Sequence, residues 1–184
     1  MIIILGVAGS GKSMQGRLLA DEAGYPWLST GELLRVLITG KRRQEMLQGK
    51  LLSDDEVINV FNTVVNLIDT KKEFVLDGFP RTVKQTDWIL DEILAGRFKL
   101  TAIYHLVASE DDVRERLKSR GRIDDTENAI NKRFEEYNNV TLPILDHFKK
   151  EGINVVDIDA ALAPKEVHKI IMTNLSSLNT TNQE

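Results

Sequence analysis

The sequence predicts an α/β fold in which a parallel β-sheet is flanked by helices. Two observations lead to this prediction: short β-branched runs alternate with amphipathic stretches, and a glycine-rich loop directly follows the first of these runs. Such alternation is typical of βαβ units, because parallel strands need a crossover connection, usually a helix, between them. The chain has 184 residues and no Pro- or Gly-rich linker, so we expect one compact domain.

The predicted strands are four short apolar runs, at residues 2–5, 74–76, 102–107 and 153–158. Apolar residues recur at helical spacing within residues 57–68, 130–137 and 167–178, which predicts helices with one core-facing stripe. We interpret these stripes as packing surfaces and assign no function to them. Residues 179–184 are polar and lack periodicity, which predicts a frayed end.

Composition excludes several classes of function. The chain has no cysteine, so disulfides, cysteine nucleophiles and Cys-based zinc sites are excluded, and we expect no structural zinc. A formal charge of −4 argues against a nucleic-acid surface, which requires clustered Lys and Arg. No apolar run approaches the roughly 18 residues of a membrane span, and the first residues do not predict a signal peptide. We therefore expect a cytoplasmic protein that binds neither nucleic acid nor membranes.

The strongest motif lies directly after the first predicted strand. Residues 6–13 read GVAGSGKS and match the pattern G-x-x-x-x-G-K-[ST], and a helix-like stretch over residues 14–23 follows. Glycines let backbone N–H groups turn toward phosphate oxygens, the helix N-terminus adds its positive end, and Lys12 adds a full charge. The loop therefore predicts nucleotide binding, but it does not choose among the many P-loop activities.

A second motif, LDGFPR, occupies residues 76–81 at the end of another predicted strand. Open parallel sheets place their ligands at such strand ends. There Asp77 can hold Mg²⁺ through water, and Arg81 offers a planar fork for a phosphate. If a helix begins near Thr82, Gln85 lies on the same face as Arg81. Near residue 30, either Ser29 or Thr30 is a candidate N-cap.

A third group of candidates is basic and surrounds Gly121 and the pair Asp124-Asp125. Its members are Arg116, Arg120, Arg122 and Arg133. Any one of them alone would be interpreted as part of a solvated helix face. Together they suit the stabilisation of a phosphoryl group in transfer, because positioned cations supply most of that catalysis.

These motifs together resemble the adenylate kinase family, from Ile2 to about Ile171. The glycine loop, the D-G-F-P-R-x-x-x-Q stretch at residues 77–85 and the G-R-x-D-D stretch at residues 121–125 occur in the family's order. Thr30 and Arg35 resemble the family's AMP-side threonine and arginine. Residues 49–54 resemble the segment that borders the AMP base.

The resemblance implies a five-stranded parallel sheet flanked by helices, and reversible phosphoryl transfer from Mg·ATP to AMP that gives two ADP. The implied AMP-binding insert covers about residues 30–60, the short lid about residues 120–126, and the core about residues 1–29, 61–119 and 134–178. Both mobile parts would close over the substrates, a motion for which the adenylate kinase lid is itself a standard example. We expect a monomer whose partners are the nucleotides ATP, AMP and ADP.

The resemblance also implies roles for individual residues. The residues implied for ATP binding are Gly9, Ser10, Gly11, Lys12, Ser13, Met14, Arg116 and Arg120. Those implied for AMP binding are Thr30, Arg35, Leu52, Gly78, Arg81, Gln85, Arg122 and Arg133. The implied catalytic residues are Lys12, Arg81, Arg120, Arg122 and Arg133. Mg²⁺ would bind with ATP, held by Asp77 through water, with Ser13 as a second candidate ligand.

No side-chain base is expected, because the acceptor is a phosphate oxygen that is already largely ionised near neutral pH. The three histidines, His105, His147 and His168, are therefore interpreted as packing or surface residues.

The chain departs from the family's pattern at several places, including Ala8 where the family usually has Pro and a shortened stretch between Arg35 and Gly49; two further departures carry predictions. Ser13-Met14 replaces the usual Gly-Thr after the loop lysine, which predicts an altered metal preference. Gly121 alone separates Arg120 from Arg122, so the lid is minimal and should exclude water less completely. We therefore predict ATP hydrolysis in the absence of AMP.

Two alternatives stay open at this point. A pyrimidine monophosphate kinase would use CMP or UMP, but such enzymes often have Ala and Asn where this chain has Thr30 and Gln85. A catalytically weak nucleotide-binding module would share the P-loop, but the retention of Lys12, Asp77 and the candidate arginines speaks against it.

Overall fold

The computed structural model describes residues 1–48 and 52–181, and a five-stranded parallel sheet lies at its centre. The strands are β1 (Ile2–Gly6), β2 (Trp27–Ser29), β3 (Val75–Asp77), β4 (Ala102–Val107) and β5 (Val155–Asp159), in the order β2-β3-β1-β4-β5. All four strand pairs are parallel. The five-stranded sheet is confirmed. The edge strand β2 is the one that the residues alone did not predict.

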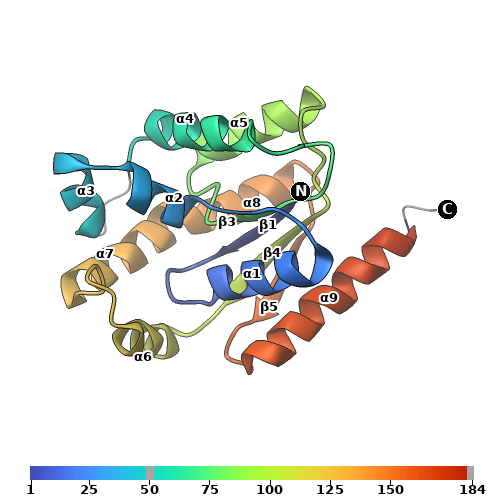
Figure 1. Cartoon of the computed structure of the whole chain (residues 1–184). Coiled ribbons are helices and arrows are strands. Elements are labelled where there is room, and N and C mark those ends of the chain that lie inside the picture. Colours follow the sequence, from blue (N-terminus) through green and yellow to red (C-terminus); the bar gives the residue numbers. More distant parts are fainter. Residues whose placement is uncertain (49–51, 182–184) are drawn as a thin grey trace.

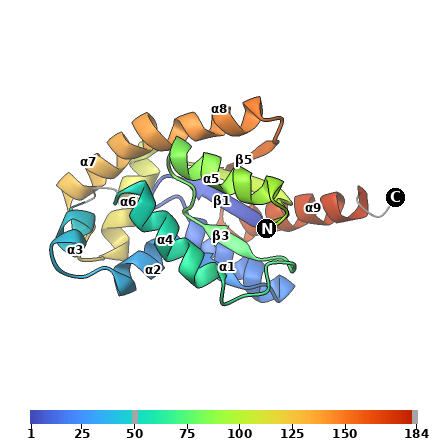
Figure 2. The same cartoon turned by 90° about the horizontal axis from the view of Figure 1, so that it is seen from above.

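Helices cover both faces of the sheet (Figures 1 and 2). The helical segments are α1 (Lys12–Ala23), α2 (Thr30–Leu37), α3 (Gly40–Leu47), α4 (Asp54–Val65), α5 (Val83–Leu94), α6 (Glu110–Arg120), α7 (Glu127–Glu136), the π-helix η1 (Tyr137–Thr141), α8 (Leu142–Lys150) and α9 (Pro164–Thr181). α1 and α9 cover one face, and α4, α5 and α8 cover the other.

The alternation of side chains along β1 builds two separate cores. Ile3 faces the core that α4, α5 and α8 complete, whereas Ile2 and Ile4 face the core under α1 and α9. All three side chains are fully buried. A strand that is buried on both faces reads as a continuous apolar run, which is why β1 was predictable from sequence.

Several helices begin at side-chain caps. The hydroxyl groups of Ser109, Thr82 and Thr126 accept hydrogen bonds from the first turns of α6, α5 and α7. The cap predicted near residue 30 differs. Ser29 occupies the N-cap position of α2 but makes no side-chain cap bond, and Thr30 is the first residue of the helix.

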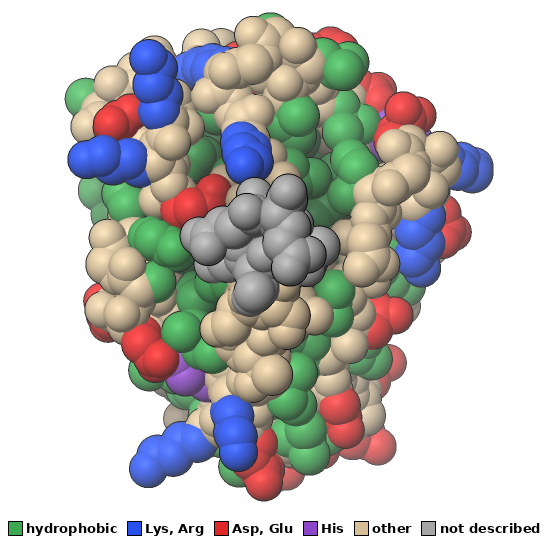
Figure 3. All heavy atoms as spheres, turned by 90° about the vertical axis from the view of Figure 1, so that its right-hand side faces the viewer, with side chains coloured by type: hydrophobic (Ala, Val, Ile, Leu, Met, Phe, Trp, Pro, Cys, Tyr) green, Lys and Arg blue, Asp and Glu red, His purple; other side chains and the backbone are tan. Residues whose placement is uncertain are grey.

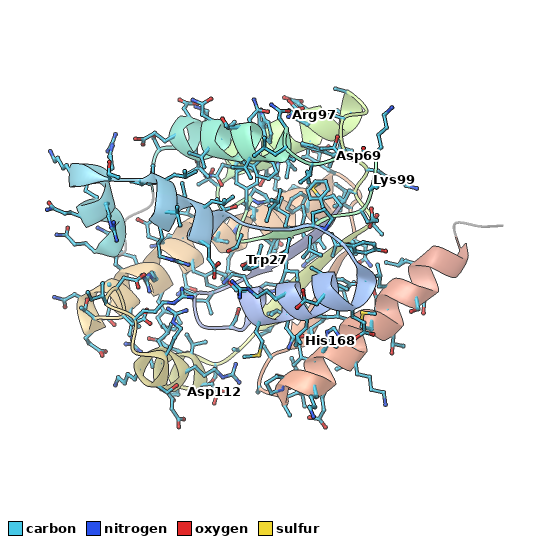
Figure 4. The ribbon with its side chains drawn as sticks, in the orientation of Figure 1. Trp27, Asp69, Arg97, Lys99, Asp112 and His168 are labelled. Carbon is cyan, nitrogen blue, oxygen red and sulfur yellow. The ribbon has the colours of Figure 1, made fainter. Side chains whose placement is uncertain are left out.

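Long-range contacts hold α1 between the sheet and α9. Trp27 in β2 lies against α1, and Nε2 of His168 in α9 lies 2.8 Å from Oε2 of Glu22 (Figure 4). Residues 179–181, which the sequence predicted to fray, belong to α9, because poor helix formers cost only tenths of a kcal/mol each once a helix is established. Residues 182–184 lie outside the described part of the chain. Among the helices of that part, none is long and apolar enough to cross a membrane.

The two ends of the strands differ in surface character. Figure 3 views the end where the strands begin, and there basic, acidic and apolar side chains are interspersed. The carboxyl ends of the strands lie at the opposite side, between the α2–α3 region and the α6–α7 region (Figure 1). Ligand sites of open parallel sheets lie at that end.

Candidate active site

A cavity of about 640 Å³ opens at the carboxyl ends of the strands. It is lined by every residue that the resemblance implied for ATP, AMP or metal binding. The glycine loop after β1, the Asp77–Arg81 turn after β3, α2 and the α6–α7 connection all contribute to its walls. Leu52, from the segment expected to border the AMP base, is a fifth contributor. That segment can be described only from Leu52 onward, because residues 49–51 lie outside the described residues.

The glycine loop is pressed between β4 and α6. Gly6 has a φ of 144°, and a Cβ there would lie 2.7 Å from the carbonyl oxygen of Leu106. Gly9 has a φ of 91°, and a Cβ there would lie 2.9 Å from Val113 and from Leu117. Both the backbone conformation and the close approach therefore require glycine at these positions.

Lys12 lies at the bottom of the loop with its charge poorly compensated. Its Nζ donates a 2.8 Å hydrogen bond to the carbonyl oxygen of Val7. Burial is the main cause that lowers the pKa of Lys12 to about 8; the carboxylate of Asp77 opposes this change, and the charges of nearby arginines add to it. A phosphate group would supply the counter-charge that this buried ammonium lacks.

Asp77 and Ser13 form the part of the site that fits a metal ion. The Ser13 hydroxyl donates a 2.6 Å hydrogen bond to Oδ2 of Asp77, which is 2% exposed. In the described part of the chain, no group of three or more His, Asp or Glu side chains could hold a metal. A single carboxylate with a nearby hydroxyl fits Mg²⁺, which keeps several waters and usually binds through one or two carboxylates plus substrate phosphates.

The side of the cavity that is expected to bind AMP combines a buried hydroxyl with an oriented amide. The Oγ1 of Thr30 is buried and has no hydrogen-bond partner. The Oε1 of Gln85 accepts a 2.8 Å hydrogen bond from the backbone N–H of Arg81, and its Nε2 donates at 2.8 Å to Oδ1 of Asp54. Each of these amide atoms retains one further hydrogen-bonding position, so both residues can still contact a base.

Two arginines converge next to Gly31 in α2. A Cβ at Gly31 would lie 3.6 Å from the guanidinium groups of both Arg35 and Arg81. Arg81 is anchored by a 2.8 Å hydrogen bond from its Nε to the carbonyl oxygen of Gly78. Burial lowers the pKa of each guanidinium, but arginine remains charged in proteins. The pair forms a fork for one phosphate group.

Arg120 and Arg133 are held by the Asp124-Asp125 pair. Arg120 donates from Nε and Nη2 to the carboxylate of Asp125 at 2.8 and 2.6 Å, and Arg133 donates to Asp125 at 2.8 Å and also to Asp124. Burial by itself would raise the pKa of Asp125, but the hydrogen bonds from both arginines outweigh it and hold that pKa below its usual value. The two arginines are thus oriented before any ligand binds.

The remaining two arginines reach the cavity from its rim. Arg116 donates a 2.8 Å hydrogen bond to the carbonyl oxygen of Ala160, next to the loop that precedes α9. Arg122 lies 4.0 Å from Glu32 of α2, across the mouth of the cavity. One partly buried ion pair therefore links the α6–α7 connection to α2.

Sequence reasoning gave no individual role to several polar residues in or beside the cavity, among them Asp54, Tyr137 and Thr141. Asp54 orients Gln85 and also accepts a 2.7 Å hydrogen bond from Thr82. Tyr137 and Thr141 line the cavity from η1. In the sequence, Asp54 was singled out only as the last residue of the segment that resembles the border of the AMP base, with no role of its own. Tyr137 was placed in a core stripe by its helical spacing, which gave no sign of its hydroxyl group's surroundings.

Comparisons with known proteins point to one family. The family model described as "Adenylate kinase" matches residues 4–153. An adenylate kinase of Corynebacterium urealyticum is 38% identical over 161 residues, covering 84% of this chain and 88% of that relative. An adenylate kinase of Nocardia farcinica is 39% identical over 175 residues, covering 91% and 94%. One of Rhodopirellula baltica is 36% identical over 177 residues, covering 92% of each.

Proposed function

The chain belongs to the adenylate kinase family, and we propose that its cleft binds Mg·ATP beside AMP and transfers the terminal phosphoryl group between them. The observation that supports this proposal is the charge of the cavity. Seven cationic side chains line it: Lys12, Arg35, Arg81, Arg116, Arg120, Arg122 and Arg133. Three carboxylates line it: Asp77, Asp124 and Glu136. Such an excess of positive charge suits two polyphosphate substrates.

We assign the donor nucleotide to the glycine loop. The backbone N–H groups from Gly9 to Met14 and the Lys12 ammonium would hold the β and γ phosphates. Arg116 would lie with its guanidinium plane against the adenine ring, since arginine stacks well on aromatic faces. Mg²⁺, when bound through Asp77 and Ser13, would neutralise part of the phosphate charge.

We assign the acceptor to the opposite wall of the cavity. Arg35 and Arg81 would clamp the AMP phosphate, and Thr30, Leu52 and Gln85 would border its base. One oxygen of that phosphate forms a bond to the γ-phosphorus as the bond to the β–γ bridging oxygen breaks, so ADP forms on both sides. The acceptor needs no side-chain base, because a phosphomonoester is largely ionised near neutral pH.

We assign the transferring phosphoryl group to the arginines at the end of α6, just after it and in α7. Arg120, Arg122 and Arg133 would contact its equatorial oxygens, where charge spreads in the transition state. Their contacts with Asp124 and Asp125 orient the guanidinium groups in advance, which lowers the cost of placing them around the reacting group. Residues 120–126 would form the lid, and α2, α3 and the start of α4 the AMP-binding insert.

We also propose that the protein works as a cytoplasmic monomer. What supports the monomer is that the residues implied for ATP binding and those implied for AMP binding line one cavity of a single chain. The complete absence of cysteine is compatible with a reducing compartment.

The test of this proposal is ADP formation from Mg·ATP with AMP, CMP, UMP or GMP supplied separately. We expect ADP from AMP, and strong loss of that product in a Lys12→Met variant, which keeps the side-chain length but removes the charge. A preference for CMP or UMP would be consistent with the proposed mechanism of transfer but would contradict the proposed role of Thr30 and Gln85 in binding the AMP base. No transfer to any acceptor would contradict the proposal as a whole.

A further inference from the structure

A hydrogen-bonded series of three side chains lies beside the cleft. Nδ1 of His105 in β4 lies 2.7 Å from Oδ1 of Asp157 in β5, and its Nε2 lies 2.5 Å from the hydroxyl oxygen of Tyr137. The His105 side chain is 7% exposed, whereas that of Asp157 is 60% exposed. The series thus runs from solvent through a buried imidazole to a residue that lines the cavity.

The direction of these hydrogen bonds follows from their ends. A carboxylate only accepts, so Nδ1 of His105 carries a proton that it donates to Asp157. In the neutral ring, Nε2 then accepts a hydrogen bond from the Tyr137 hydroxyl. Burial raises the pKa of Tyr137 to about 12, and the charge of Asp157 acts in the same direction, so the hydroxyl keeps its proton near neutral pH. Tyr137 is therefore the donor of a buried bond to the sheet.

Tyr137 begins the only π-helical segment of the described chain, η1, which is held by one internal hydrogen bond and one to the Arg81 backbone. The backbone N–H of Leu142 donates to the carbonyl oxygen of Tyr137, five residues earlier. At the end of η1, the Thr141 hydroxyl donates a 3.1 Å hydrogen bond to the carbonyl oxygen of Arg81. π-helical turns are rare and concentrate at functional sites. Here the turn joins α7 to the helix that packs in the core.

Tyr137 is also linked directly to Arg133. Its backbone N–H donates to the carbonyl oxygen of Arg133, and both side chains line the cavity. The Tyr137 ring packs in the cluster that includes Val7 of the glycine loop and Phe134 of α7. A shift of the Tyr137 ring would thus be transmitted to the end of α7 that carries Arg133.

We propose that His105 is a positioning residue for phosphoryl transfer, which acts by holding Tyr137 and thereby fixing Arg133 over the reacting group. This inference rests on the role proposed above for Arg133. A displacement of about 1 Å in a catalytic group can lower a rate by roughly 10². Because Arg133 is assigned to the transition state, loss of its position should lower kcat more than it raises either KM.

The experiment compares His105→Phe, Tyr137→Phe and their double variant with the wild type in ADP formation and urea unfolding. We expect each single variant to lower kcat about tenfold, with both KM values nearly unchanged, and the double variant to be no slower than either. His105→Gln should recover much of the rate, because its Oε1 can accept the Tyr137 hydrogen bond. If His105→Phe does not fold, Tyr137→Phe and His105→Gln carry the same comparison.

Tyr104→Phe is the matched control. Tyr104 precedes His105 in β4, faces the opposite core and donates a 3.1 Å hydrogen bond to Oδ1 of Asn174 in α9. Its loss should lower stability and leave kcat unchanged. If His105→Phe behaves as Tyr104→Phe does, His105 is only a packing residue and the inference is overturned.

A crystal structure of His105→Phe gives a second readout that does not depend on turnover. A displaced Arg133 guanidinium supports the positioning role, and an unmoved one overturns it. If the wild type forms no ADP, the proposed function fails, and the position of Arg133 in the variant still decides whether His105 controls it.

Discussion

Ser13 Oγ donates a 2.6 Å hydrogen bond to Oδ2 of Asp77, which joins the end of the glycine loop to the end of β3. Both groups are candidates for the coordination sphere of a bound Mg²⁺, either as direct ligands or through water. We predict that Ser13→Gly changes the metal dependence of the rate, because Asp77 loses the partner that orients it. With a hydrogen bond to a charged group worth about 2 kcal/mol, the Mg²⁺ concentration for half-maximal rate should rise at least severalfold.

The measurement compares Mg²⁺ and Mn²⁺ titrations of ADP formation in the wild type, Ser13→Gly and Ser13→Thr. Ser13→Thr keeps the hydroxyl and should titrate as the wild type does. Superimposable curves for all three proteins would show that this hydroxyl has no part in metal binding.

Lys12 should make the free energy of unfolding depend on pH in an unusual window. Burial lowers its pKa to about 8, below its ordinary value of about 10.4. Between those values the unfolded chain binds more protons than the native protein, so the free energy of unfolding rises with pH. Below pH 8, Lys12 is charged in the native protein, and its burial lowers the free energy of unfolding by the full amount. Above a pH of about 10.4, Lys12 is neutral in both states and no longer lowers the free energy of unfolding.

Lys12→Met removes this dependence. After allowance for the lost hydrogen bond to Val7, we expect the variant to be about 2 kcal/mol more stable than the wild type at pH 7, with the difference shrinking toward pH 10. Urea denaturation at pH 7, 8, 9 and 10 measures it. Parallel curves for the two proteins across this range would contradict a lowered Lys12 pKa.

Thr30 should contribute to the choice of acceptor. Its hydroxyl is buried without a partner, and a buried polar group that is paired only by the right ligand discriminates strongly between ligands. We predict that Thr30→Ala lowers kcat/KM for AMP by roughly tenfold, or about 1.4 kcal/mol, and lowers it less for CMP. Thr30→Ser keeps the hydroxyl and should retain the preference for AMP. An unchanged ratio of AMP to CMP in Thr30→Ala would remove this residue from base recognition.

The sheet was predictable from sequence to the extent that its strands are continuous apolar runs. β1, β3 and β4 are such runs, because central strands of a parallel sheet are buried on both faces. β5 is an edge strand in which Asp157 and Asp159 are exposed, and its β-branched residues made it predictable. β2 is a three-residue edge strand, Trp27–Ser29, and is too short to show any periodicity. α3 was not predicted either, because its sequence GKRRQEML is mostly polar and carries no apolar stripe.

The same distinction applies to the site. The glycine loop is encoded locally, since positive φ values and close approaches demand glycine at fixed positions in the sequence. The Asp54–Gln85 and His105–Tyr137 contacts join residues that are 31 and 32 positions apart. Single polar residues at such separations leave no periodic pattern, so His105 was interpreted as a packing residue. Its hydrogen-bond partners became evident only from the fold.

Gly16 should be required by Trp27 rather than by its own backbone. A Cβ at Gly16 would lie 2.7 Å from Nε1 and 3.1 Å from Cδ1 of Trp27. Alanine in a helix interior ordinarily stabilises by about 1 kcal/mol relative to glycine, but overpacking costs about 1 to 3 kcal/mol. We predict that Gly16→Ala lowers the free energy of unfolding by about 1 kcal/mol in urea titrations. Adding Trp27→Phe should recover part of this loss, and a Gly16→Ala protein as stable as the wild type would contradict the clash.

The short connection between α6 and α7 should let water reach the bound donor. Gly121 is the C-cap of α6, and Thr126 already caps α7, so few residues are available to cover the cavity. Ile123, within this connection, is 87% exposed. Because water is excluded less completely than under a longer lid, we predict slow release of inorganic phosphate from Mg·ATP without AMP, severalfold above that of Lys12→Met. Phosphate release no faster than that of Lys12→Met would contradict this prediction. It would mean that even this minimal cover shields the γ-phosphate from water.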